Sequence, residues 1–104
     1  MRQITKDAIK SFYAGKDFKQ SNTEVKAYNN STNLYLFGNH IAELEHNATV
    51  DNESILKITN AGYETVTTKE RLNGLEGVNI VQRDFVWYLN GKEWNGNWIE
   101  VETQ

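Results

Sequence analysis

The spacing of apolar residues predicts a helix at the start of the chain. Apolar side chains recur there three or four positions apart, at Ala8, Ile9, Phe12 and Tyr13. This spacing places them on one face of an α-helix. Thr5 is a suitable N-cap because its hydroxyl can accept from a free backbone amide, and Gly15 is a suitable end because glycine readily adopts the left-handed conformation. We therefore expect a helix over Thr5–Ala14.

From Thr23 onward apolar and polar residues alternate, which predicts strands. The predicted strands are Thr23–Tyr28, Leu34–Phe37, Ile41–Glu45, Ser54–Thr59, Val78–Arg83, Phe85–Leu89, Lys92–Trp94 and Trp98–Val101. Two-residue turn signals at Gly38-Asn39 and Asn90-Gly91 are too short for a parallel crossover, so they predict antiparallel pairing. The polar segment His46–Asn52 is predicted to be a loop.

A second, short helix is predicted between the strands. Thr67-Thr68-Lys69-Glu70 has the spacing of a capping box, in which the first hydroxyl and the last carboxylate accept each other's backbone amides. Asn73-Gly74 would end this helix. The fold class is thus α+β, a single domain over residues 1–104 with both helices packed on a mostly antiparallel sheet built of hairpins. The stripe of the first helix should bury against Val25, Leu36, Ile41, Ile58, Ile80 and Trp87.

Composition removes several kinds of chemistry. The chain has 104 residues and no cysteine, which excludes disulfides, thiolate metal sites and thiol catalysis. His40, Glu43 and His46 are three positions apart, but on a strand residues three apart point to opposite faces. The sequence also lacks a phosphate-binding glycine loop and a serine beside a histidine. We therefore expect no metal site, no cofactor and no enzymatic activity.

Charge is unevenly distributed. Residues 1–26 carry six cations against three acids, whereas the formal net charge of the whole chain is −3. A net negative chain argues against a sequence-independent nucleic-acid binder, which needs a dense cationic surface. Lys6 and Lys10 share the polar face of the predicted first helix. They either contact phosphate or an acidic partner, or simply form a solvated helix face.

Five of the twelve aromatic residues lie within Phe85–Trp98, including all three tryptophans. One interpretation is a cross-strand cluster that closes the small core. The other is an exposed aromatic platform that binds a protein, a sugar or a base. The candidate partner-binding residues are Trp94, Trp98, Tyr88, Lys6 and Lys10.

Two motifs carry a resemblance to a family of small bacteriophage proteins of unknown function. They are Thr67–Leu75 (TTKERLNGL) and Trp87–Trp94 (WYLNGKEW), with Val81-Gln82 between them. Further similar segments are Ile4-Thr5, Asn22–Val25, Leu34–Asn39 and Ile41-Ala42. The segment Leu44–Ser54 departs from the family pattern because it is longer and more polar. The resemblance implies an accessory phage protein in the cytoplasm of an infected bacterium, and it supplies no active-site residues.

Three functions are compatible with these observations. The first is a non-enzymatic module that binds an unidentified host protein and modulates it, for example as an inhibitor of a bacterial defence system. The second is a single-stranded nucleic-acid-binding protein that uses the basic first helix and the aromatic residues. The third is a minor structural or assembly protein of the virion. No apolar run reaches the length of a membrane span, so we expect no membrane contact.

The predicted packing of the first helix gives a direct test. Replacing Phe12 with alanine should lower the free energy of unfolding by about 3–5 kcal/mol, since it leaves a cavity in the core. The control Lys10→Ala, on the polar face, should change it by less than about 0.5 kcal/mol. Denaturant melts measure both. Equally small effects would mean that this helix does not pack on the sheet.

Overall fold

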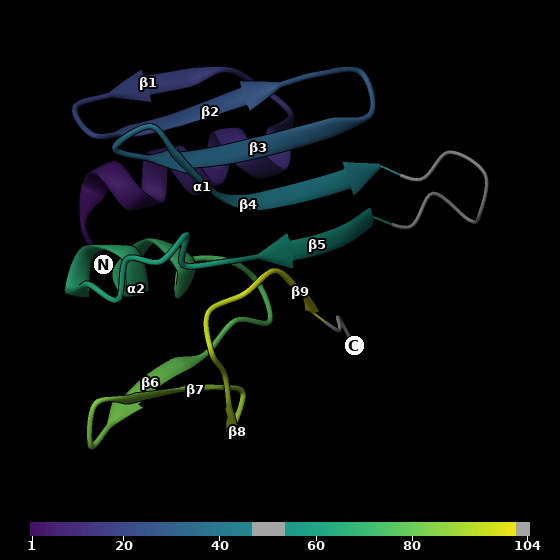
Figure 1. The fold of residues 1–104 in the computed structure, drawn as a ribbon. Coiled ribbons are helices and arrows are strands. Elements are labelled where there is room, and N and C mark those ends of the chain that lie inside the picture. Colours follow the sequence, from purple (N-terminus) through teal and green to yellow (C-terminus); the bar gives the residue numbers. More distant parts are fainter. Residues whose placement is uncertain (47–53, 102–104) are drawn as a thin grey trace.

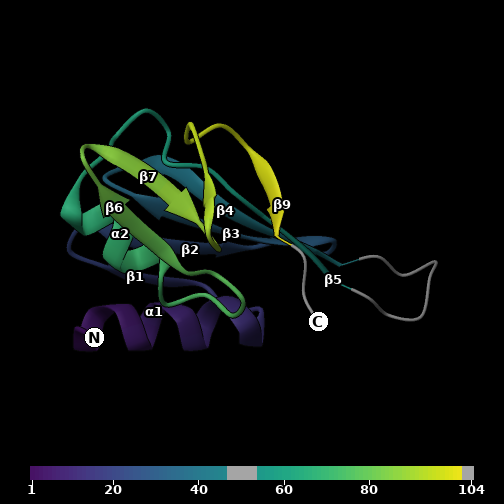
Figure 2. The ribbon, with the colours of Figure 1, turned by 90° about the horizontal axis from the view of Figure 1, so that it is seen from below.

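The computed structural model describes residues 1–46 and 54–101. A six-stranded sheet forms its centre, with helix α1 (Gln3–Ala14) against one face (Figures 1 and 2). Its strands, in spatial order, are β1 (Phe18–Gln20), β2 (Thr23–Ala27), β3 (Ser31–Leu36), β4 (Asn39–His46), β5 (Ser54–Ile58) and β9 (Ile99–Val101). Every neighbouring pair in this sheet is antiparallel.

A second, smaller sheet lies beside the first in Figure 1. It consists of β6 (Ile80–Arg83), β7 (Val86–Leu89) and β8 (Lys92–Glu93), again antiparallel, and helix α2 (Val66–Leu72) precedes it in the chain. The α+β class with two helices is thus confirmed. The strands divide into two sheets, and the short edge strand β1 was not predicted because it has too few residues to show an alternating pattern.

The predicted packing of α1 on the sheet is confirmed. Phe12 is completely buried, and Ile9 and Tyr13 are partly buried against the same core. All six predicted partners are buried in the same core: Val25, Leu36, Ile41, Ile58, Ile80 and Trp87. Val25 and Leu36 lie on β2 and β3, which α1 contacts, whereas Ile80 and Trp87 belong to a second sheet rather than to the one on which α1 packs.

The start of α1 differs from the prediction, whereas its end agrees. The helix begins at Gln3, and the N-cap is Arg2, which makes no side-chain capping bond. Thr5 lies inside the helix and is buried, because its hydroxyl bonds to residues of α2. Gly15 ends the helix in the left-handed conformation, with φ of 67°, as the sequence predicted.

The predicted capping box of α2 is wrong. The N-cap is Thr65, whose hydroxyl accepts from the backbone amide of Thr68 at 3.1 Å. The carboxylate of Glu70 accepts instead from the hydroxyl of Thr5 on α1 and from the backbone amide of Arg2, the residue before that helix. A long-range partner thus replaces the local one that the motif suggested.

The β3–β4 turn lies one residue earlier than predicted. Leu36 pairs with Asn39, so the two central residues are Phe37 and Gly38, with φ of 51° and 79°. This is the positive-φ geometry that matches the twist of two antiparallel strands. The Asn90-Gly91 turn between β7 and β8 is confirmed, with φ of 51° and 86°.

A β-bulge in β4 overturns the expectation for the histidines. Tyr35 pairs with His40 and Leu34 pairs with Ala42, so Ile41 is an extra residue on β4. His40 and Glu43 consequently share the face turned away from α1. His46 instead bonds to Thr32, a buried residue of the opposite face. The prediction from alternation was wrong because one inserted residue moves all later side chains of the strand to the opposite face.

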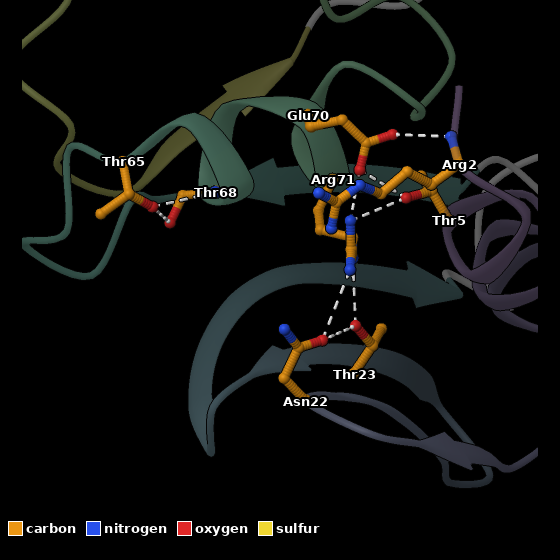
Figure 3. A network of polar contacts seen from close by, with 8 residues as sticks. All are labelled: Arg2, Thr5, Asn22, Thr23, Thr65, Thr68, Glu70 and Arg71. Atoms are coloured by element: carbon orange, nitrogen blue, oxygen red, sulfur yellow. Dashed lines mark hydrogen bonds and ion pairs between the residues drawn. The ribbon is translucent and has the colours of Figure 1, made fainter.

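One buried arginine connects the two helices to the sheet (Figure 3). Arg71 of α2 is 1% exposed. Its guanidinium donates to the hydroxyl of Thr23 at 3.0 Å and to that of Thr5 at 2.9 Å. It also bonds to the carboxylate of Glu70 and, at 3.4 Å, to Asn22 Oδ1. We call these five residues the Arg71 network.

The Glu70 carboxyl completes this network. Its burial acts to raise its pKa, but hydrogen bonds from Thr5, the Arg2 amide and Arg71 outweigh burial and hold the pKa below the ordinary value. The carboxyl is therefore ionised at neutral pH and neutralises the buried guanidinium. An ion pair of this kind requires all of its donors and acceptors to be matched, because the unpaired charges would be costly to bury.

Removal of the guanidinium should therefore strongly lower the free energy of unfolding. Arg71→Met keeps most of the aliphatic stem but leaves Glu70 and the two threonines without their partner, and it should cost about 3–5 kcal/mol of unfolding free energy. The matched control Arg83→Met removes an exposed guanidinium that lies over the Tyr88 ring, and it should cost less than about 1 kcal/mol. Urea melts compare the two variants. Similar losses in both would refute a special role for the Arg71 network.

Candidate partner-binding surface

The tryptophans of the Phe85–Trp98 segment divide between core and surface. Trp87 and Trp94 are buried, with ring centroids 6.2 Å apart, and the indole N–H of Trp94 donates to the Asn97 carbonyl at 2.9 Å. Trp98 is 48% exposed. The core interpretation of this segment therefore holds for Trp87 and Trp94, whereas Trp98 is exposed and its role in partner binding stays a prediction.

Trp98 extends a row of rings on the face of the six-stranded sheet opposite α1, which we call the open face. Its ring meets His40 edge-on at 4.9 Å, and His40 stacks on Tyr35 at 4.9 Å. The ammonium of Lys26 lies 5.1 Å from the Tyr35 centroid. Strand pairing brings these residues together from β2, β3, β4 and the residue before β9.

The other candidate residues lie elsewhere. Lys6 and Lys10 are exposed on α1, and α1 lies along one face of the sheet (Figure 2), whereas Trp98 lies against His40 on the open face. Tyr88 is half-buried in β7, with the Arg83 guanidinium 5.5 Å from its ring centroid. The structure therefore does not bring the basic helix and the exposed tryptophan onto one surface.

Sequence reasoning missed the segment that organises the exposed apolar surface, residues 60–65, here called the 60–65 loop. On one side of it lies a groove of about 380 Å³, the Phe37 groove, lined in part by Phe37 and Tyr63. On the other side lies a groove of about 620 Å³, the Phe85 groove, lined in part by Glu64 and Phe85. The loop forms a wall of both.

Contacts with the segment before β9 fix the 60–65 loop in place. The backbone carbonyl of Gly96 accepts from the Thr59 hydroxyl at 2.6 Å and from the Asn60 amide at 3.0 Å. A Cβ at Gly96 would lie 2.1 Å from the Asn60 side-chain amide, so only glycine fits there. Asn60 also accepts from the Gly62 amide at 2.8 Å. The walls of both grooves are thus preorganised.

Large apolar side chains are exposed around these two grooves. The described residues expose nine such side chains. Four of them line one of these two grooves, namely Phe37, Tyr63, Phe85 and Ile99, and Trp98 is next to Ile99 in the chain. Phe37 and Phe85 are 68% and 89% exposed. Apolar surface gathered in this way is typical of an interaction site.

The signals that could have located this surface are weak. The sequence predicts strands over Leu34–Phe37 and Phe85–Leu89, which include both phenylalanines. Asp84 between two apolar runs was the only turn signal near Phe85. The exposure of both phenylalanines follows from turn geometry, which the residue pattern does not encode.

His40 is electrostatically distinct within the open face. Burial lowers its pKa below the ordinary value, although a hydrogen bond with the Ala42 backbone and the charge of Glu43 act in the opposite direction. Its Nε2 atom is buried without a hydrogen-bond partner among residues 1–46 and 54–101. The ring is therefore neutral at pH 7 and serves as an apolar spacer between Tyr35 and Trp98.

A model of one protein family, described as Kyanoviridae Gp96 protein, matches residues 1–103. Comparisons with curated proteins and with solved structures found no match. No helix among the described residues is both long and apolar enough to cross a membrane.

The His40 pKa predicts a pH dependence of stability. Because the folded-state pKa lies below the unfolded value of about 6.5, protonation favours the unfolded chain, and stability should fall as the pH drops below about 6.5. His40→Phe keeps a ring between Tyr35 and Trp98. It should lose the part of the fall in stability between pH 7 and 5.5 that comes from protonation of His40. His46→Phe is the matched control and should retain it. Urea melts at several pH values measure the effect, and equal pH profiles for wild type and His40→Phe would contradict it.

Proposed function

The chain belongs to the Kyanoviridae Gp96 protein family, a family of phage proteins, and from this premise we propose that it is a non-enzymatic module that binds a protein of the infected bacterium and modulates it. The observation that supports the proposal is the exposed apolar surface around the 60–65 loop. An inhibitor of a bacterial defence system is one form that such a module would take.

The energetics of this surface favour protein recognition. Aromatic side chains supply most of the binding energy at interfaces when they enter pockets on a partner. Phe37, Tyr63 and Trp98 expose such rings here, while the core is already closed by other residues. Because the 60–65 loop is held by Gly96 and Asn60, binding would not have to order it. Preorganisation of this kind increases affinity without any new contact.

A single-stranded nucleic acid is the second candidate, and the ring row on the open face supports it. Bases stack on exposed aromatic rings, and Lys26 beside Tyr35 could approach a phosphate. The same face carries Glu24, which lies opposite Tyr35 in the strand register, and Glu43, which lies opposite Lys57. Since Lys6 and Lys10 lie on the other side of the sheet, phosphate contacts would be few, and a protein partner is better supported.

The proposal is tested by capture from host lysate followed by reconstitution. Tagged wild-type protein should enrich a defined host protein, and the purified pair should co-elute in size-exclusion chromatography whether or not nuclease is added. Phe37→Asn should weaken binding by about tenfold, as expected for loss of an aromatic anchor. This variant leaves an Asn-Gly turn, which the hairpin geometry favours.

The control for this experiment is Tyr28→Ser. Tyr28 is also an exposed aromatic residue, but it lies in the β2–β3 connection, at the other end of the strands from the Phe37-Gly38 turn (Figure 1). Its replacement should leave binding unchanged. Absence of any enriched protein across several host lysates, or loss of the complex on nuclease treatment, would overturn the proposal.

A further inference from the structure

Two turns hold phenylalanine where the backbone favours asparagine or glycine. Three two-residue turns join antiparallel strands with both central residues at positive φ: Phe37-Gly38, Asp84-Phe85 and Asn90-Gly91. The third has the preferred pair for this geometry. In the second, Phe85 takes the position that glycine normally occupies, with φ of 68°.

The side chain of Phe85 adds no buried apolar surface to the core. A left-handed backbone brings the Cβ of any L-residue close to a carbonyl oxygen, and a bulky residue is rare there. Burial could compensate for this strain, but Phe85 is 89% exposed. Strained positions persist where they serve a role outside the fold. The side chain is therefore placed for contact with something else.

The surroundings of Phe85 indicate what that contact is. It stands on the rim of the Phe85 groove, whose apolar lining includes Trp94 and Ile99. The groove also has two carboxylates, Glu64 and Glu93, and the described residues that line it include no cation. An apolar groove with negative charge on its walls is complementary to a cation that stands next to an apolar group.

We propose that the Phe85 groove receives a segment of the partner protein in which a lysine or arginine stands beside a large apolar side chain. This inference rests on the proposed function. The cation would pair with Glu64 or Glu93, and its apolar neighbour would pack on Phe85 and Ile99. Two carboxylates in the lining disfavour a phosphate-bearing ligand.

A second copy of the chain is a weaker occupant. Its basic surface is the exposed face of α1, with Lys6 and Lys10. Docking of that helix into the groove of a neighbour would be a head-to-tail contact, which produces open chains unless the rotation happens to close. The partner segment therefore comes from a different protein.

The charge pattern of the occupant can be measured without knowing the partner. Intact protein is used to select binders from a library of random dodecapeptides. The selected sequences should share a lysine or arginine within two positions of a leucine, phenylalanine or tryptophan. An acidic or uncharged consensus, or no enrichment at all, would overturn the inference. Self-association in sedimentation experiments, with no peptide enriched, would assign the groove to a second copy.

Variants then locate the selected peptide on the surface. Phe85→Gly should weaken its binding by about tenfold, while its unfolding midpoint stays equal to that of wild type or rises, because glycine relieves the backbone strain. Glu64→Gln combined with Glu93→Gln should weaken binding and flatten its dependence on salt, since the attraction is between charges. Tyr28→Ser should change neither the affinity for the peptide nor its dependence on salt. Wild-type affinity in Phe85→Gly would refute the assignment to this groove.

These outcomes are separable from those of the proposed function. If wild-type protein captures a host protein and Phe85→Gly captures it equally well, the groove assignment is wrong and the proposed function stands. If wild-type protein captures no host protein while the peptide consensus is basic and apolar, the groove chemistry stands and the proposed function is wrong.

Discussion

The rest of the structure depends on the burial of one positive charge. The guanidinium of Arg71 lies between α1, α2 and the β1–β2 turn, where an unmatched charge would be prohibitive. Thr5, Thr23 and Glu70 must therefore remain within hydrogen-bond distance of it, which fixes how α1 and α2 meet the six-stranded sheet. Because α2 follows the 60–65 loop and precedes the three-stranded sheet, its position also sets where the loop ends and where the chain leads into that sheet. The Arg71 network and the contacts of Gly96 with Thr59 and Asn60 together position the loop between the two grooves.

The sequence predicted the features that depend on neighbours in the chain and missed those that depend on distant ones. Period and turn signals identified α1, most strands and the buried face, because burial repeats with the geometry of each element. Thr5 and Glu70 were both assigned local capping roles, which are the commonest use of those residue types at helix starts. Thr5 instead accepts from Arg71, 66 positions away, and donates to Glu70, 65 positions away. No local pattern distinguishes a threonine that caps its own helix from one that binds a buried arginine in another.

Single-residue shifts account for the errors in the sheet. The β3–β4 turn moved by one position and turned Phe37 from a strand residue into an exposed turn residue. The same shift pairs His40 with Tyr35 on the open face, where Trp98 joins the row, and the bulge at Ile41 changes the facing of the residues beyond it. An alternating pattern locates the end of a strand only to within about one residue, and in a sheet a shift of one residue moves a side chain to the other face. The candidate surface lies at such strand ends, where an error of one residue changes which side chains are exposed.

The placement of this surface on turns has a physical advantage. A ring at the tip of a two-residue turn has few neighbours, so it can enter a partner's pocket without displacing its own fold. Turns are usually mobile, and mobility would increase the entropy lost on binding. Here the adjoining 60–65 loop is tied to Gly96, and the strands next to Phe37 and Phe85 are paired directly up to the turn. The chain thus combines the exposure of a loop with the rigidity of a sheet, the combination that a small binding module needs when its core leaves little room for a deep pocket.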